Sequence, residues 1–447
     1  MLKNIIVLFI SVLYVMTAFG ETSAVKIDPS IQKYIDAQLE KKGSEVVPSP
    51  FEFGGYFRTG TQRIGSGGSK SSGACYSLNL NRNDGAFYRL GNECRDYGEF
   101  NFIHKGKKNG IEYKSVFMLD IAGDSRSSTG TESWSRRSRQ LYVELKGLFD
   151  DNSKLWVGRR YYRAIGDIGD IHVLDGFHVQ SSGNGFGLSD VQLGNSVHQF
   201  ALIGYGGEDD PADATDPEKN VQNYLIDIRS NLKSNQNSYQ LAVQKLFVSE
   251  TADSLADNTS GSTISLQWQR KFDILDNKII IQRGDGSMSE NPGCFGTDGN
   301  CFNMSAKSAD SAYRLISNGT FDWGSRWVLH YVALMQDSEE FNKWNSIGVR
   351  PHYKLGKYWS VLAEISQDNF TTKNNGKPLD EQQLNKYTLA MQASLDAQNF
   401  WERPSLRFYI SQFVWNSAAD TQSANIGLSD SDVKNSTIFG AQAEIWF

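Results

Sequence analysis

After its first twenty residues, the sequence has no stretch approaching the roughly 18 uninterrupted apolar residues that a transmembrane helix requires. A helical membrane protein is therefore excluded. The formal charge is −6, and no run rich in lysine or arginine occurs, which argues against a nucleic-acid partner. Only four cysteines are present, and neither of their two local pairs has the spacing of a zinc site.

Catalytic and metal-binding motifs are missing as well. The six histidines are scattered, with no HExxH and no GxSxG motif, so we expect no enzyme activity. His172 and His178 could in principle share a metal ion. Strand alternation and the lack of an adjacent carboxylate motif favour ordinary surface or loop histidines, so we expect no metal and no cofactor.

The chain begins with an export signal. Lys3 gives a positive start, residues 5–15 form an apolar run, and small residues suited to cleavage follow, so residues 1–20 are predicted to be a signal peptide cut after Gly20 or Ala24. In an exported protein, close cysteine pairs indicate loop disulfides. We expect Cys75 to pair with Cys94 and Cys294 with Cys301.

Residues 21–50 are predicted to be a short periplasmic extension. A helical pattern opens at Asp28-Pro29-Ser30 and ends at Gly43, and the proline-containing linker 45–50 follows. A helix of about 13 residues is marginal alone, so it would have to associate with copies of itself or with the rest of the chain. No further linker divides residues 51–447, which we expect to form one barrel.

From Phe51 onward the sequence is typical of strands of roughly 9 to 13 residues, separated by clusters of Gly, Asn, Asp and Ser. About eighteen such strands predict an all-β fold, a transmembrane antiparallel β-barrel wide enough for an aqueous lumen. A large soluble β-sandwich or propeller would share much of the composition, including 12% aromatics. Clear strands are predicted at residues 111–122, 140–148, 155–162, 197–206, 239–248, 327–336 and 406–415.

The final strand, Thr437 to Phe447, separates the barrel from these alternatives. Phe439, Ile445 and the alternate residues between them are apolar, and the intervening positions carry Gln442, Glu444 and Trp446. Apolar side chains then face lipid and polar ones face the lumen. A chain that ends on such a strand with a terminal aromatic residue is typical of a bacterial outer-membrane barrel.

The same alternation turns three aromatic rings inward, each beside charged or amide groups. Tyr56 lies next to Arg58 in one strand, Tyr97 next to Glu99 in another, and Trp446 next to Glu444. Sugars have an apolar face of C–H groups and a rim of hydroxyls, so such rings and charges form a suitable track. Any one ring could instead belong to the girdle at a barrel end or pack under an infolded loop.

Several motifs resemble those of the maltoporin-like sugar porins, a group that includes sucrose and β-glucoside porins. The resemblance extends from about residue 51 to the end of the chain. The motifs are Gly54-Gly55-Tyr56-Phe57-Arg58-Thr59-Gly60, Tyr88-Arg89-Leu90-Gly91-Asn92-Glu93-Cys94-Arg95-Asp96-Tyr97-Gly98-Glu99, Trp156-Val157-Gly158-Arg159-Arg160-Tyr161-Tyr162, Gly348-Val349-Arg350-Pro351, Trp401-Glu402-Arg403-Pro404 and Gly440-Ala441-Gln442-Ala443-Glu444-Ile445-Trp446.

The resemblance implies a homotrimer of eighteen-stranded barrels in the bacterial outer membrane, each narrowed by an inward-folded third loop. It implies facilitated diffusion of oligosaccharides along an aromatic path, with Trp134 donated by the neighbouring subunit. By the resemblance, the path comprises Tyr56, Tyr97, Trp134, Trp446 and Tyr358, and its ionic and constriction residues are Arg58, Arg89, Glu99, Arg139, Arg163, Asp170, Asp175 and Phe177.

Departures from the family pattern leave the identity of the sugar open. Phe177 stands where the family has a constriction tyrosine, Gln180 replaces an acidic residue, and one aromatic position has only Tyr358 as a candidate. Two other functions remain as alternatives: a general diffusion porin with little sugar selectivity, and a surface receptor or adhesin that uses exposed loops such as residues 207–222.

Overall fold

The computed structural model describes most of the chain beyond residue 49, with gaps in several connections. The described residues are 50–67, 75–78, 87–93, 95–123, 134–163, 171–172, 178–206, 222–249, 260–292, 294–295, 309–324, 326–374, 376–397, 399, 401–420, 428 and 433–447. Residues 1–49 form a separate unit outside these ranges, so the predicted signal peptide and helical extension stay predictions. In the described part of the chain, no helix has the length and apolar character needed to span a membrane.

The described residues form a sheet of 20 strands, of which β12 and β17 have only two residues each, leaving eighteen long strands. The prediction of an eighteen-stranded barrel is confirmed. The long strands are β1 Phe51–Gly67, β2 Asp96–Lys108, β3 Ile111–Gly123, β4 Trp134–Lys146, β5 Lys154–Arg163, β6 Gln180–Leu193, β7 Ser196–Gly206, β8 Gln222–Ser234, β9 Asn237–Ser249, β10 Gly261–Lys271, β11 Leu275–Asp285, β13 Ser311–Asp322, β14 Trp327–Ser338, β15 Asn342–Lys354, β16 Trp359–Asn374, β18 Gln382–Ser394, β19 Ser405–Trp415 and β20 Asn435–Trp446; the short ones are β12 Cys294–Phe295 and β17 Lys377–Pro378. A 3₁₀ turn, η3 (Gly286–Met288), and a one-turn helix, α4 (Ser417–Asp420), lie in connections.

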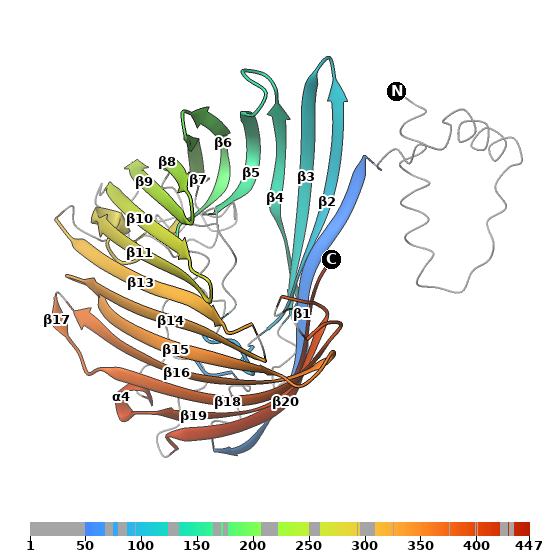
Figure 1. The fold of residues 1–447 in the computed structure, drawn as a ribbon. Helices are drawn as coiled ribbons and strands as arrows, with labels where there is room; N and C mark the ends of the chain where they lie inside the picture. Colours follow the sequence, from blue (N-terminus) through green and yellow to red (C-terminus); the bar gives the residue numbers. More distant parts are fainter. Residues whose placement is uncertain are drawn as a thin grey trace, which may run out of the picture. The chain divides into compact units, whose positions relative to one another are not determined.

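The sheet closes on itself between its first and last strands. The long strands pair antiparallel with their neighbours in chain order, and β1 pairs with both β2 and β20 (Figure 1). In this register Tyr56 lies opposite Glu99 of β2 on one side and opposite Trp446 of β20 on the other. Closure removes the exposed strand edges that an open sheet would present to lipid, where backbone groups cannot find water.

Short turns connect the strands at the end of the barrel where β1 begins and β20 finishes. The β2–β3 turn consists of Asn109 and Gly110, both with positive φ, as a two-residue hairpin turn requires. The β8–β9 turn is similar, with Asn235 at φ 53°. Longer connections lie at the opposite end, as between β7 and β8. Because outer-membrane barrels have short periplasmic and long extracellular connections, the short-turn end is the periplasmic one.

Alternation along each strand produces an apolar outer surface and a polar interior. Phe53 and Phe439 face outward and are 58% and 50% exposed, whereas Gln442 and Glu444 face inward and are buried. The outward side chains form the band that lipid solvates. One predicted strand differs: residues 140–148 were expected, but β4 spans Trp134–Lys146, with an irregularity in its pairing to β3 at Met118 and Leu119.

Parts of two connections contact the inner wall of the barrel. Arg314 of β13 donates to the carbonyl of Pro292 at 2.7 Å, and β12 pairs parallel with the start of β6. Gln282 of β11 donates to the carbonyl of His178 at 2.8 Å, which fixes the end of the connection between β5 and β6. Buried polar side chains of the barrel wall are thus hydrogen-bonded to chain that enters the lumen.

Candidate functional site

Three aromatic rings lie side by side on adjacent strands where the barrel closes. The rings of Tyr56 and Trp446 are stacked, with centroids 6.5 Å apart and planes inclined by 25°. The rings of Tyr56 and Tyr97 are 6.4 Å apart and tilted by 51°. Strand alternation predicted that each ring faces inward, and the pairing of β1 with β2 and β20 brings the three together.

Glu444 is the acidic centre of this ring cluster. Its Oε1 accepts a hydrogen bond of 2.9 Å from the Tyr56 hydroxyl. Its Oε2 lies 3.0 Å from Nε and 2.9 Å from Nη2 of Arg403, and 3.1 Å from Nη1 of Arg407. All three charged residues are buried, so their mutual pairing satisfies charges that would otherwise be costly in the barrel interior.

Arg403 also contacts one of the three rings. Its Cζ lies 4.1 Å from the centroid of the Trp446 indole, which is a cation–π contact. One face of that indole is therefore covered by a guanidinium that Glu444 holds in place. Since Trp446 is still 39% exposed, the rest of the ring is accessible from the lumen.

The connection between β1 and β2 supplies a second group of ion pairs beside the rings. Glu93 is 3.0 Å from Nε of Arg58 and 2.8 Å from Nη2 of Arg89, and that same Arg89 nitrogen donates to the Tyr56 hydroxyl at 3.1 Å. Burial lowers the pKa of the Arg89 guanidinium, but the Glu93 carboxylate and Tyr56 raise it more strongly. Arg89 therefore stays charged beside the ring.

Tyr97 and Glu99 complete the cluster on β2. The Tyr97 hydroxyl donates to Glu99 Oε1 at 2.5 Å, and Arg58 Cζ lies 5.2 Å from the Tyr97 ring centroid. Among the predicted residues, Tyr56, Tyr97, Trp446, Arg58, Arg89 and Glu99 thus form one connected group of rings and charges.

Two further predicted arginines lie elsewhere on the inner wall. Arg139 of β4 is buried and forms a salt bridge with the buried Asp120 of β3. Arg163 at the end of β5 lies over the ring of Tyr161, 4.1 Å from its centroid. The pairing of β5 with β4 ends at Arg159, so these last residues of β5 pair with β6 only.

Of the remaining predicted residues, the structure describes the side chains of Tyr358 and Cys75. Tyr358 lies in the turn before β16, half-exposed, with Lys357 Nζ 5.0 Å from its ring centroid. Cys75 is buried, but its expected partner Cys94 lies outside the described residues, so both cysteine pairings stay predictions. Also outside the described residues are Asp170, Asp175, Phe177, Cys301 and the side chains of Trp134 and Cys294.

The two histidines considered as metal ligands pack among other side chains. His172 stacks on Phe87 with ring centroids 5.1 Å apart and lies 5.6 Å from the ring of Trp344. Burial, and nearby cations such as Lys278, lower the pKa of His178 to about 3, so this residue is neutral. Within the described ranges, no cluster of three or more potential ligands could hold a metal ion.

Sequence reasoning missed Glu93, Arg403 and Arg407 as members of the cluster. Glu93 and Arg403 stand inside the quoted family motifs, but alternation gave no reason to select them, because both lie outside the long strands. Arg407 does lie on β19, where its inward direction could have been derived from the outward Leu406 and Phe408.

A closed antiparallel barrel, apolar outside, with rings and ion pairs on its inner wall, defines the class of pore-forming outer-membrane proteins. The LamB porin family model matches residues 51–447, and the chain therefore belongs to the LamB porin family. It is a porin of the bacterial outer membrane.

Two solved structures are similar to this chain at low sequence identity. The structure of Acinetobacter baumannii OccAB1 is 10% identical with a TM-score of 0.50, covering 89% of this chain and 96% of that one. A BenF-like porin from Pseudomonas fluorescens Pf-5 is 9% identical with a TM-score of 0.49, over 89% of this chain and 99% of that one. The likeness to OccAB1 concerns the fold alone.

Proposed function

We propose that this porin is specific for sugars and allows facilitated diffusion of oligosaccharides along the aromatic cluster of Tyr56, Tyr97 and Trp446. The observation that carries the proposal is the direct adjacency of the three rings, with centroid separations of 6.4 and 6.5 Å. Rings at this spacing offer a continuous apolar surface to the C–H faces of successive sugar units.

The charges beside the rings fit the hydroxyl rim of a sugar. Arg58, Arg89, Glu93 and Glu444 already bond one another and Tyr56, so each donor or acceptor is held in place before a sugar arrives. Prior pairing also keeps each new contact weak, because a sugar hydroxyl must compete with an existing partner. Weak successive contacts suit a channel, which must release what it binds.

A general diffusion porin is the second candidate among channels. It would place arginines opposite acidic residues at its constriction and would have no need for a row of stacked rings. The row of adjacent rings therefore favours the sugar-specific channel.

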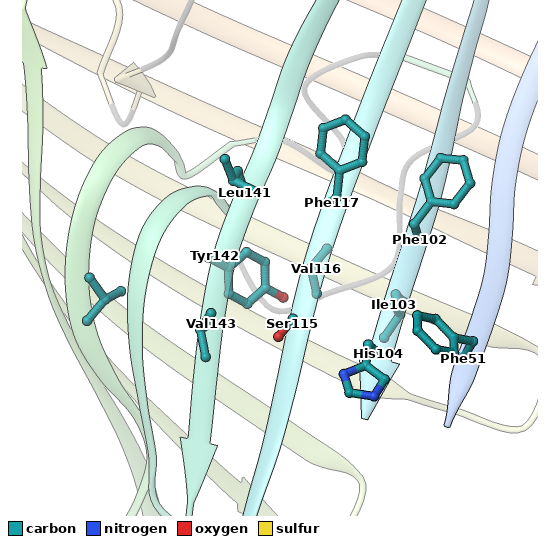
Figure 2. Close-up of a pocket in the computed structure, with 11 residues that line it drawn as sticks. Phe51, Phe102, Ile103, His104, Ser115, Val116, Phe117, Leu141, Tyr142 and Val143 are labelled. Carbon is teal, nitrogen blue, oxygen red and sulfur yellow. The ribbon is translucent and has the colours of Figure 1, made fainter. Parts of the chain in front are cut away.

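Family membership also supports the proposal of a homotrimer, and one outer surface fits a subunit contact. An apolar groove of about 330 Å³ lies across strands β1 to β5, and Figure 2 shows Phe102, Phe117, Leu141 and Val143 among its lining residues. Ser115 contributes a small side chain there, which leaves the hollow that a bulky side chain of a second copy would fill. Light scattering of the purified porin in detergent should give the mass of three chains, and a single-chain mass would contradict the trimer.

The sugar specificity is tested by single-channel current through the purified porin in a planar bilayer. Maltohexaose, sucrose and the β-glucoside arbutin are added in turn over a range of concentrations. We expect reversible block by at least one sugar, saturating with concentration. Open current that none of them blocks would instead favour the general diffusion porin. Absence of current would favour a surface receptor or adhesin that uses the exposed loops.

The ring cluster is tested by the double variant Tyr56→Ala and Trp446→Ala. Loss of two stacking rings, at about 0.5–1.5 kcal/mol each, should weaken sugar affinity by about fivefold to more than a hundredfold while leaving ion conductance nearly intact. The matched control is Trp359→Ala, because Trp359 is an exposed indole on the outward face of β16. Unchanged sugar affinity in the double variant would contradict the proposed role of the rings in sugar binding.

A further inference from the structure

Arg283 of β11 and Lys245 of β9 are two cations on the outward, lipid-facing side of the barrel wall. Alternation sets their direction, because the residues on either side of each cation along its strand are buried. Both strands continue into long connections, so the pair lies toward the extracellular end. A lipid-facing Arg or Lys is costly at the bilayer midplane and is tolerated only near the interface. Two such cations on neighbouring strands therefore require an anionic environment.

The level of the pair in the membrane follows from an aromatic neighbour. Tyr313 of β13 is the direct partner of Arg283 across the sheet, and Arg283 Cζ lies 5.4 Å from the centroid of its ring. This tyrosine faces outward and is 53% exposed. Outward tyrosines near strand ends form the girdle at the boundary between hydrocarbon and headgroups. The guanidinium of Arg283 thus lies at the level of the headgroups in the extracellular leaflet.

The acidic side chains on this part of the outer face already have other partners. Asp285 accepts hydrogen bonds from the Ser262 hydroxyl at 2.8 and 2.7 Å and from the Ser262 backbone N–H at 3.0 Å. Asp337 of β14 forms a salt bridge of 2.6 Å with Lys373. In the part of the chain that the structure describes, neither of the two outward cations forms an ion pair. Their charge is therefore available to an anion from outside the protein.

Apolar side chains lie next to the cations on the side toward the bilayer midplane. Ile264 and Leu266 of β10 and Ile281 of β11 face outward, and each is more than half exposed. The single strand β10 separates Lys245 from Arg283, with an offset of two residues along the strands. Their Cα atoms are therefore about 12 Å apart. Two cations above an apolar surface match an amphiphile that has two phosphates in its headgroup and acyl chains below.

We propose that Arg283 and Lys245 form a binding site for lipopolysaccharide of the extracellular leaflet. The lipid A part of this glycolipid carries a phosphate on each of its two sugar units and several acyl chains. Arginine binds phosphate oxygens through two parallel N–H groups, and lysine adds a point charge. The site does not depend on which solute passes through the lumen. It also lies across the barrel from β1, β2 and β3, which carry part of the proposed subunit contact (Figure 1).

The experiment measures lipid binding to the purified porin in detergent by native mass spectrometry. Wild type, Arg283→Gln, Lys245→Gln and the double variant are titrated with bisphosphorylated lipid A and, separately, with phosphatidylglycerol. We expect lipid A affinity to fall about fivefold in each single variant and about 25-fold in the double variant, because each basic residue contributes one phosphate contact. Phosphatidylglycerol has one phosphate, so wild type should bind it about fivefold more weakly than lipid A.

Arg326→Gln is the matched control. Arg326 is an exposed arginine at the periplasmic end, with Nη1 3.3 Å from the Tyr353 hydroxyl, and its replacement should leave lipid A affinity unchanged. Open-channel conductance in planar bilayers should equal that of wild type in every variant, which shows that each barrel is folded. If the double variant does not insert, the two single variants decide the result.

Three results would overturn the proposed lipid site. The first is equal lipid A affinity in wild type and the Arg283 and Lys245 variants. The second is an equal fall in Arg326→Gln, which would show that only the net charge of the protein matters. The third is phosphatidylglycerol bound as tightly as lipid A with the same loss in the double variant, which would indicate a phospholipid site instead. None of these results bears on the proposed sugar specificity, which current block tests separately.

Discussion

Replacing Glu444 by glutamine should destabilise the barrel closure more than any exposed charge replacement of the same kind. Glutamine keeps the shape of the side chain and removes its charge. In the structure, Glu444 Oε2 accepts a hydrogen bond from Nε of Arg403 and lies within ion-pair distance of Nη2 of Arg403 and Nη1 of Arg407, and all three residues are buried. The substitution therefore weakens one charge-assisted hydrogen bond and removes the negative charge from two further ion-pair contacts.

The loss in free energy of unfolding can be worked from the strength of charged and neutral hydrogen bonds and from the cost of breaking a buried ion pair. A bond to a charged partner contributes about 1.5–3 kcal/mol and a neutral one about 0.5–1.5 kcal/mol, so the bond from Arg403 Nε loses about 1 kcal/mol. The two buried arginines also lose the charge that pairs with them, and removal of one partner from a buried ion pair costs about 3–5 kcal/mol, so the free energy of unfolding should fall by about 3 kcal/mol. The bond from Tyr56 adds little, because a tyrosine hydroxyl can accept from the new amide.

The assay is a urea titration of the porin folded in lipid vesicles, with the folded fraction measured by gel mobility. Glu112→Gln is the matched control. Glu112 pairs with Lys107 and Lys146 at the periplasmic turn end, where its side chain is half-exposed, and its replacement should leave the urea midpoint unchanged. Equal midpoints for Glu444→Gln and wild type would refute the idea that this ion-pair centre stabilises the closure.

Two further substitutions test how the cluster is built. Tyr56→Phe keeps the ring but removes the hydroxyl that Arg89 and Glu444 bind; current-block titration should show a loss of sugar affinity smaller than that of Tyr56→Ala, and an equal loss would show that the ring itself contributes nothing. Gly348→Ala should lower stability by about 1–3 kcal/mol and change the open-channel conductance, because the added Cβ would collide with the ring of Tyr88 in the infolded segment that carries Arg89. Gly356→Ala, in open space, is its control, and equal urea midpoints and conductances for the two variants would contradict this packing.

The sequence by itself determined the barrel and the direction of its rings. A β-strand places alternate side chains on opposite faces, so the outward Phe439 and the inward Trp446 followed from their positions along one strand. The same local rule gave the inward direction of Tyr56 and Tyr97. Strand ends were less certain, as β4 shows, because a local irregularity in pairing changes where a strand begins without changing its apolar pattern.

Only the tertiary structure decided which charges meet those rings. Tyr56 and Glu444 are separated by 388 positions in the chain and become neighbours because the last strand pairs with the first. Glu93 and Arg89 reach Tyr56 because the connection that carries them folds inward, with Tyr88 packed against Gly348 and bonded to Ser346. Arg403 reaches Trp446 because it lies in the turn between β18 and β19, and β19 pairs with the last strand. Local periodicity specifies the face of a strand, but contacts made by loops and by barrel closure depend on packing between distant segments, which no local pattern contains.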